Sequence, residues 1–238
     1  MHHVVLERWS RGSSVLHRRD PRAKIAPLLI FLVVLATAHS ALPALAAALF
    51  LLLCAALVWA RLPLAGAVIR AGIILPFTLV FAAICWLGGD PARGLSLLLK
   101  SYLSALAVLL VVSTTPLPLL LRGLEMTGVP RFLLMVAQFL YRYLFVISEE
   151  AQHMRIAAAS RGGPRNRPLF RAAAGALAVL FARSYGRAEE IHRAMLARGF
   201  TGRFRTLGAL HFRGSDAGFA VAASLAPALL RAAVERFV

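Results

Sequence analysis

Long apolar stretches separated by short polar breaks fill the first half of the chain and return near its end. About 20 apolar residues in a helix cross the roughly 30 Å hydrocarbon core of a bilayer. The pattern therefore predicts transmembrane helices over residues 25–38, 41–60, 65–87, 95–113 and 217–230. The first is a little short, and the last is long enough for a thin or tilted span. Pro76 predicts a kink in the third.

The region between residues 116 and 213 has a different, amphipathic pattern. A short helix over 119–126 is expected to stop at Gly128. Two long helices follow, over 129–160 and 169–198, and the first of them opens with Pro130 in its first turn. We expect both helices to lie outside the lipid, because their polar positions recur at helical spacing.

One alternative for the first of these helices stays open. Residues 132–148 could form a further transmembrane helix. Gln138 and Arg142 lie near the middle of that segment and count against it, because an unpaired charge in lipid is expensive. Together with Glu149 and His153 they are spaced 4, 7 and 4 residues apart, so they share one helical face.

Charge sets the expected orientation and the expected domains. The chain has 238 residues, 60% of them hydrophobic, and a net charge of +17. Because the arginines flank the apolar stretches, they indicate positively charged cytoplasmic segments rather than a nucleic-acid-binding domain. We expect a basic cytoplasmic leader (1–24), four transmembrane helices (25–115), a cytoplasmic helical region (116–213) and a C-terminal transmembrane helix (214–238) that ends outside.

Motifs for catalysis are missing from the sequence. It contains no GxxxxGK[ST] phosphate loop, and no HExxH, CxxC or GxSxG motif. No paired acids accompany the first four apolar stretches, which argues against a metal-dependent membrane enzyme acting on lipid substrates. Met1-His2-His3 is a weak candidate for metal binding, since two adjacent histidines are usually chance. We therefore expect no catalytic residue, no cofactor and no metal site.

Two short Arg-Gly sequences close the two long amphipathic helices. They are Ser160-Arg161-Gly162 and Ala197-Arg198-Gly199. Glycine ends helices by adopting the left-handed conformation, and arginine in the last turn faces the negative end of the helix dipole. A functional reading adds that each arginine is displayed at a helix tip, where its planar fork can bind a carboxylate or several carbonyls of a partner.

Several segments, taken in order, resemble the transmembrane T components of energy-coupling-factor (ECF) transporters, and most closely the cobalt/nickel CbiQ-like branch. These segments are the leader His17-Arg18-Arg19-Asp20-Pro21-Arg22-Ala23-Lys24, the sequence Val112-Ser113-Thr114-Thr115-Pro116, the run Tyr141-Arg142-Tyr143-Leu144-Phe145 with Glu149-Glu150, and the stretches Arg183–Ile191 and Ala194–Phe200. The resemblance covers nearly the whole chain. In the leader, Asp20 is expected to cap the first helix and Pro21 to take its first turn.

The resemblance implies a fold, a role and partners. The fold is all-α: a polytopic membrane protein with about five transmembrane helices and a cytoplasmic pair of long amphipathic coupling helices. The chain would be a non-catalytic subunit of the bacterial plasma membrane, placed between two ABC-type ATPases and a membrane substrate-binding (S) subunit. The two Arg-Gly sites would enter grooves on the ATPases, and Ser160 departs from the alanine of the family pattern. Supporting residues would be Arg142, Glu149, Glu150, Arg183, Arg187 and Glu190, with a leader motif of His17, Asp20, Pro21 and Arg22.

The cargo and two other functions stay open at the level of sequence. Cobalt or nickel is the first expectation, and biotin or other vitamins are the alternative within the same class. A membrane enzyme acting on lipid substrates and a membrane-anchored nucleic-acid binder are more distant alternatives.

Overall fold

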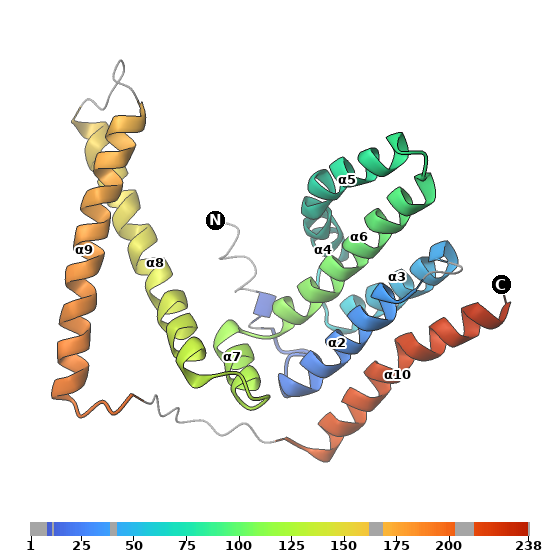
Figure 1. Ribbon diagram of the computed structural model, residues 1–238. Helices are drawn as coiled ribbons and strands as arrows, with labels where there is room; N and C mark the ends of the chain where they lie inside the picture. The colour runs from blue at the N-terminus through green and yellow to red at the C-terminus, as the bar shows by residue number, and fades with distance from the viewer. Residues whose placement is uncertain (1–8, 11, 39–41, 162–168, 203–211, 238) are drawn as a thin grey trace. The chain divides into compact units, whose positions relative to one another are not determined.

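The structure is a computed structural model that describes residues 9–10, 12–38, 42–161, 169–202 and 212–237 (Figure 1). All regular structure in these ranges is helical, which confirms the all-α prediction. The chain divides into two compact units. One comprises residues 1–128 and 210–238, and the other comprises residues 129–209. The Met1-His2-His3 and His39-Ser40 segments lie outside the described residues.

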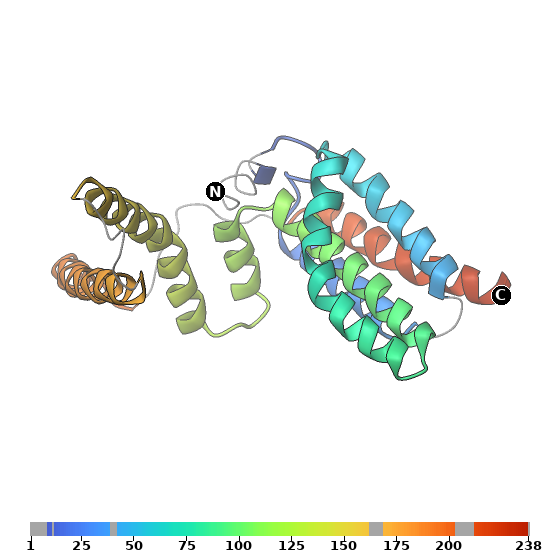
Figure 2. The ribbon, with the colours of Figure 1, turned by 90° about the horizontal axis from the view of Figure 1, so that it is seen from above.

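The first unit is a helical bundle built around one central helix. Its helices are α2 (Arg22–Ala36), α3 (Leu42–Trp59), α4 (Leu64–Ala71), η1 (Gly72–Ile74), α5 (Leu75–Leu87), α6 (Pro91–Thr114), α7 (Leu117–Glu125) and α10 (Gly214–Phe237). Helix α6 contacts α2, α3, α4 and α5, while α10 packs along α2 and α3 (Figures 1 and 2). Leu35, Leu49, Leu57, Leu103 and Leu106 are fully buried in the resulting core.

The third predicted transmembrane helix is interrupted. Residues 64–87 form α4 and α5, which are joined by the short 3₁₀ turn η1 at Gly72–Ile74. The break lies just before Pro76, the predicted position of a kink. Proline lacks the N–H that would bond to the carbonyl of Gly72, and its ring clashes with that carbonyl, so the preceding turn tightens.

The ends of two other helices follow from local chemistry. Helix α6 starts four residues earlier than the predicted 95–113, because the side chain of Asp90 accepts a hydrogen bond from the Arg93 N–H (3.2 Å) and Pro91 takes the first helical position. Helix α2 starts at Arg22, inside the predicted leader. The oxygen Oδ1 of Asp20 accepts a hydrogen bond from the Arg22 N–H (2.9 Å), which is the bond expected of Asp20 as a cap, although Pro21 is the residue directly before the helix.

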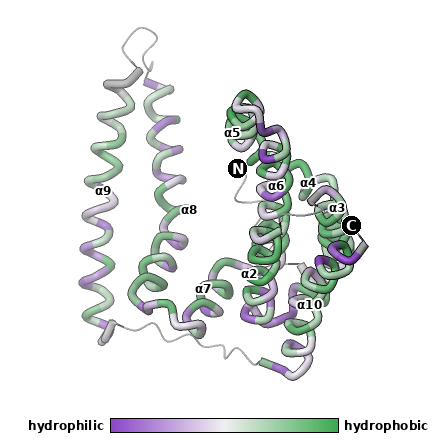
Figure 3. Tube along the Cα trace, turned by 45° about the vertical axis from the view of Figure 1, so that its right-hand side comes forward, coloured by the Kyte–Doolittle hydropathy of each residue, from purple (hydrophilic) through white to green (hydrophobic). Residues whose placement is uncertain are grey.

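Large apolar side chains cover the outside of the first unit. On α5, Phe77, Phe81, Ile84 and Trp86 are all exposed, and Leu87 is 90% exposed. Soluble monomers rarely expose a contiguous apolar surface of this kind. Figure 3 shows the same hydrophobic character along α3. The surface therefore fits lipid as the surrounding solvent.

Length and composition identify four helical segments that could cross a membrane. They are Leu64–Leu87, Pro91–Thr114, Arg131–Ser160 and Gly214–Arg236, and Pro43–Trp59 is a shorter apolar helix. Together with α2, the first unit thus offers the five apolar segments that the sequence predicts, in a polytopic membrane protein. The third segment in this set belongs to the second unit, so the alternative of a further span there stays open.

The second unit consists of the two long helices α8 (Arg131–Ser160) and α9 (Leu169–Ala197). Helix α8 is continuous for 30 residues, as the sequence predicts, and only Leu134 is buried along it. On α9, no side chain between residues 173 and 197 is buried. The two helices contact each other over a small area, and most of both surfaces is uncovered. Leu180, Ile191 and Met195 of α9 are half-buried.

Candidate functional site

The second Arg-Gly site is a fully formed helix terminator. Gly199 has a left-handed backbone (φ +76°). The Gly199 N–H bonds to the Leu196 carbonyl (2.9 Å), and the Phe200 N–H bonds to the Met195 carbonyl (3.0 Å). These two hydrogen bonds are those of the Schellman motif, which satisfies carbonyls at the end of a helix. Gly199 therefore fixes where α9 ends, and so fixes the position of Arg198 at its tip.

The first Arg-Gly site ends α8 at the corresponding place. Ser160 is the last residue of the helix, and its hydroxyl bonds to the Ala157 carbonyl (3.0 Å). Arg161 caps the helix with φ −87° and ψ +21°. Gly162 lies outside the described residues. The side chains of Arg161 and Arg198 are both exposed, and neither makes a hydrogen bond or ion pair within the described part of the chain. Among the described residues, no partner therefore occupies either guanidinium group.

One ion pair joins the two long helices. Arg183 of α9 donates a hydrogen bond from Nη1 to Oε1 of Glu150 on α8. The sequence indicated both residues as supporting the coupling helices but did not predict that they pair. The two residues are 33 positions apart in the sequence. Helical periodicity relates only residues three or four positions apart, so it could not predict this contact. This ion pair is the clearest polar contact that holds α8 and α9 together.

The other predicted supporting residues lie on the surface of the second unit. Arg142, Glu149, Arg187 and Glu190 are all exposed. Arg142 lies over the ring of its neighbour Tyr143, with 5.9 Å between the guanidinium carbon and the ring centre. Glu189 and Arg193, four residues apart on α9, form an ion pair at 3.6 Å. These residues remain available to partners, but the structure does not gather them into one cluster.

The leader motif folds back on its own chain. The ring of His17 lies between the Ser14 hydroxyl (2.6 Å to Nδ1) and the Trp9 carbonyl (2.9 Å to Nε2). The Trp9 ring in turn lies 4.0 Å from the guanidinium carbon of Arg70 on α4. His17 therefore has a structural role within the leader, and its two ring nitrogens are both engaged.

Pro21 and Arg22 pack at the start of α2. A Cβ atom on Gly123 of α7 would lie 3.0 Å from the Cβ of Pro21, so α7 approaches the leader closely because position 123 is glycine. Arg22 Nε lies 3.9 Å from Oδ1 of Asp20, and it is buried without a hydrogen-bond partner among the described residues.

A buried polar cluster joins the leader to the end of α6. Lys24 is only 4% exposed and lies ahead of the predicted first span. Its ammonium donates to the Thr114 carbonyl (3.0 Å) and to the Thr115 hydroxyl (2.8 Å). Burial lowers the pKa of the Lys24 ammonium to about 8, and the carboxylates of Asp20 and Asp216 oppose that shift. Two of the segments that carry the family resemblance therefore meet in space.

The start of α10 is attached to the same region. Nη1 of Arg19 donates to the Ser215 hydroxyl (2.8 Å) and to Oδ1 of Asp216 (3.1 Å). The other carboxylate oxygen of Asp216 accepts a hydrogen bond from the Arg213 N–H (3.2 Å), half of a capping box. The leader thus connects the beginning of the membrane unit with its last helix.

Comparison with known proteins identifies the family. A family model described as "Cobalt transport protein" (CbiQ) matches residues 12–207, which include the leader motif and both Arg-Gly sites. The chain belongs to the CbiQ family. This confirms the resemblance seen in the sequence motifs. Helix α10 of this CbiQ-family chain follows the matched range.

Individual relatives carry names from two branches. The chain is 31% identical to a cobalt transport protein CbiQ of Rhodobacter capsulatus over 118 residues, which cover 49% of this chain and 48% of that protein. Two proteins named energy-coupling factor transporter transmembrane protein EcfT match over 228 residues and 84% of each chain. They come from Acidaminococcus fermentans (30% identity) and Bacillus selenitireducens (28%). The chain thus spans about half of the first relative and most of the other two.

Proposed function

We propose that this CbiQ-family protein is the transmembrane coupling subunit of an ECF-type importer. It would link ATP hydrolysis by two cytoplasmic ABC-type ATPase subunits to movement of a membrane substrate-binding subunit. The observation that carries this proposal is the pair of exposed arginines, Arg161 and Arg198, each at the end of a long helix. A guanidinium fork at a helix tip suits a groove lined by carboxylate or carbonyl oxygens.

The second unit also has the mechanical properties that such a role needs. A 30-residue helix measures about 45 Å at 1.5 Å per residue, so motion at its tip can be carried over a long distance. The two helices are joined by the Glu150–Arg183 ion pair and bury little else. They can therefore change their separation without breaking a core, which is the requirement for a hinge or shear movement.

Reversing charge at both helix tips tests this role. We expect Arg161→Glu with Arg198→Glu to abolish co-purification of the ATPases and ATP-dependent uptake. The matched control is Arg155→Glu with Arg193→Glu, because these exposed arginines lie five to six residues before the tips on the same two helices. If association and uptake survive in the tip variant, the coupling role is wrong. Equal loss in both variants would point to general loss of positive charge.

For the cargo, we propose cobalt or nickel, with biotin or other vitamins as the alternative. The support is the description of the family model and the name of the R. capsulatus relative, both of which mention cobalt. The names of the EcfT relatives mention no substrate. Uptake of cobalt, nickel and biotin, measured side by side in membranes containing the intact complex, decides between them. Uptake of biotin alone would refute the metal assignment.

For the orientation, we propose that the leader, α8 and α9 lie on the cytoplasmic side and that the C-terminus lies outside. Single cysteines at Thr127, Ala158 and Arg236, in a chain lacking Cys54 and Cys85, test this with a membrane-impermeant maleimide. Thr127 precedes α8, Ala158 lies in its last turn, and both are exposed. We expect both to react from the cytoplasmic side and Arg236 from the other. Labelling of Thr127 and Ala158 from opposite sides would show that α8 crosses the membrane.

A further inference from the structure

A cavity of about 640 Å³ lies inside the first unit, between α2, α3, α6 and α10. This volume falls within the roughly 300–1,000 Å³ of small-molecule binding sites. Along α10 its lining runs from Ser215 to Ala226, which corresponds to about 16 Å of helix at 1.5 Å per residue. The cavity is therefore long enough to hold an extended chain of atoms rather than a single compact group.

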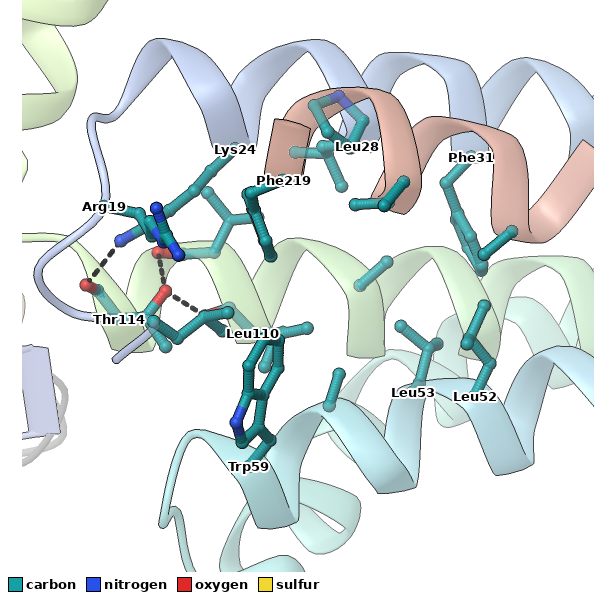
Figure 4. A pocket seen from close by; sticks show the side chains of 18 of the residues that line it. Arg19, Lys24, Leu28, Phe31, Leu52, Leu53, Trp59, Leu110, Thr114 and Phe219 are labelled. Atoms are coloured by element: carbon teal, nitrogen blue, oxygen red, sulfur yellow. Dashed lines mark hydrogen bonds between the residues drawn. The ribbon is translucent and has the colours of Figure 1, made fainter. Parts of the chain in front are cut away.

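The two ends of this cavity differ in chemistry. Figure 4 shows Arg19, Lys24 and Thr114 at one end, and Phe31, Leu52 and Leu53 toward the other. Apart from the polar end, the lining is aliphatic or aromatic, and alanines of α3, α6 and α10 leave the space open. A ligand that fits must therefore be mostly hydrocarbon, with one polar group at its end.

The polar end is cationic toward the cavity. Arg19 makes its two hydrogen bonds through Nη1, and Lys24 uses two of the three N–H groups of its ammonium. Both side chains therefore retain donors for a further acceptor. The carboxylates near them, Asp20 and Asp216, do not line the cavity. The lining itself therefore offers N–H donors on two cationic side chains, which suit an anionic acceptor.

We propose that this cavity binds one acyl chain of an anionic amphiphile, with the hydrocarbon along α3 and α10 and the anionic head beside Arg19 and Lys24. The chemical class is an acyl chain that ends in a carboxylate or phosphate. Two sources carry it, an anionic phospholipid of the bilayer and a free fatty acid. The site is distinct from the Arg-Gly tips, so the proposal stands independently of the coupling role.

Retention of defined lipids by the full-length chain tests the proposal. The chain is purified in a neutral detergent, stripped of lipid, and titrated separately with phosphatidylglycerol, phosphatidylcholine and palmitate, each with matched acyl chains, and bound lipid is counted by native mass spectrometry. We expect one phosphatidylglycerol or palmitate per chain, bound at least tenfold more tightly than phosphatidylcholine. Equal retention of phosphatidylglycerol and phosphatidylcholine would overturn the proposal, and this comparison requires no variant.

Variants that fill the cavity provide a second test of the proposal. Ala56→Leu with Ala223→Leu places extra side-chain atoms in the space from α3 and α10, and Ala47→Leu with Ala233→Leu adds the same atoms on the exposed sides of those helices. We expect at least a tenfold loss of phosphatidylglycerol retention in the first variant and less than a twofold change in the control. An unchanged affinity in the filled variant would place the lipid elsewhere. Tighter binding of palmitate than of phosphatidylglycerol identifies the free acid as the source, and the reverse identifies the phospholipid.

Discussion

The Glu150–Arg183 ion pair should control how far apart the two long helices lie. The Arg183 side chain is 60% exposed and that of Glu150 is 27% exposed. Exposed ion pairs contribute about 0.2–1 kcal/mol, which corresponds to a factor of roughly 1.4–5 in an equilibrium constant at about 1.4 kcal/mol per tenfold. Because α8 and α9 bury almost no apolar side chain against each other, this small term is a large share of what holds them together.

Removing the pair should therefore separate the helices measurably without unfolding them. We expect Arg183→Ala to raise the population of the separated arrangement by about 1.4–5-fold. Glu150→Arg should separate the helices further through repulsion between like charges. The charge swap, Glu150→Arg with Arg183→Glu, should restore the original distribution. The measurement is the distribution of distances between spin labels at Ala157 and Ala194, which are exposed on α8 and α9.

Two controls make the result specific. The Glu189–Arg193 pair is also an exposed ion pair but lies within α9, so Arg193→Ala should leave the distances between the labels unchanged. High salt should mimic Arg183→Ala, because the screening length falls to about 3 Å at 1 M salt. The reasoning is refuted if Arg183→Ala leaves the distribution unchanged. It is also refuted if the swap fails to restore the distribution, because charge complementarity would then not be the cause.

Three further changes have expected outcomes that follow from single contacts. Gly199→Ala places a side chain at φ +76° and should speed hydrogen exchange of the terminal α9 amides about fivefold, for a cost of about 1 kcal/mol. Gly199→Asn should do less, and an unchanged rate for Ala would contradict the role of the left-handed backbone. Asp216→Asn removes the charge from a buried, charge-assisted hydrogen bond worth about 1.5–3 kcal/mol, and should lower the Tm by roughly 3–12 °C. Its control is Glu235→Gln, in an exposed pair of the same helix, with a shift below about 2 °C. Gly123→Leu should expose the leader to limited proteolysis, because a Cβ atom at position 123 would already lie 3.0 Å from the Cβ of Pro21. Unaltered cleavage would show that α7 does not hold the leader in place.

Local patterns in the sequence were sufficient to predict most of the helices and some of their ends. The continuous helix α8 follows from an unbroken apolar and polar period that begins after Pro130. Gly199 as a terminator and Asp20 as a cap were predicted from residue type and position alone, and both make the hydrogen bonds expected of these roles. Such features depend on residues within one turn of each other, which is the range over which sequence order determines geometry.

Contacts between segments that are far apart in the sequence could not be predicted from such local patterns. Lys24 and Thr115 are 91 positions apart, and Arg19 and Asp216 are 197 apart. No period in the sequence relates them, so the leader motif and the Ser113-Thr114-Thr115 sequence were recognised only as separate parts of a family pattern. The break at Gly72–Ile74 was predicted in part. Pro76 indicated that the helix would be distorted in this region, but it did not indicate which turn would tighten.

The leader also shows why a count of positive charges does not assign a role to each of them. Orientation by the positive-inside rule requires cations that stay on one side of the bilayer. Arg18 is exposed, whereas Lys24 is buried against the end of α6 and Arg19 connects the leader to α10. A buried cation costs free energy unless it is hydrogen-bonded, and here Thr114 and Thr115 supply the oxygens. The same short sequence therefore carries the positive charges that the positive-inside rule counts, and its contacts also join three helices, α2, α6 and α10.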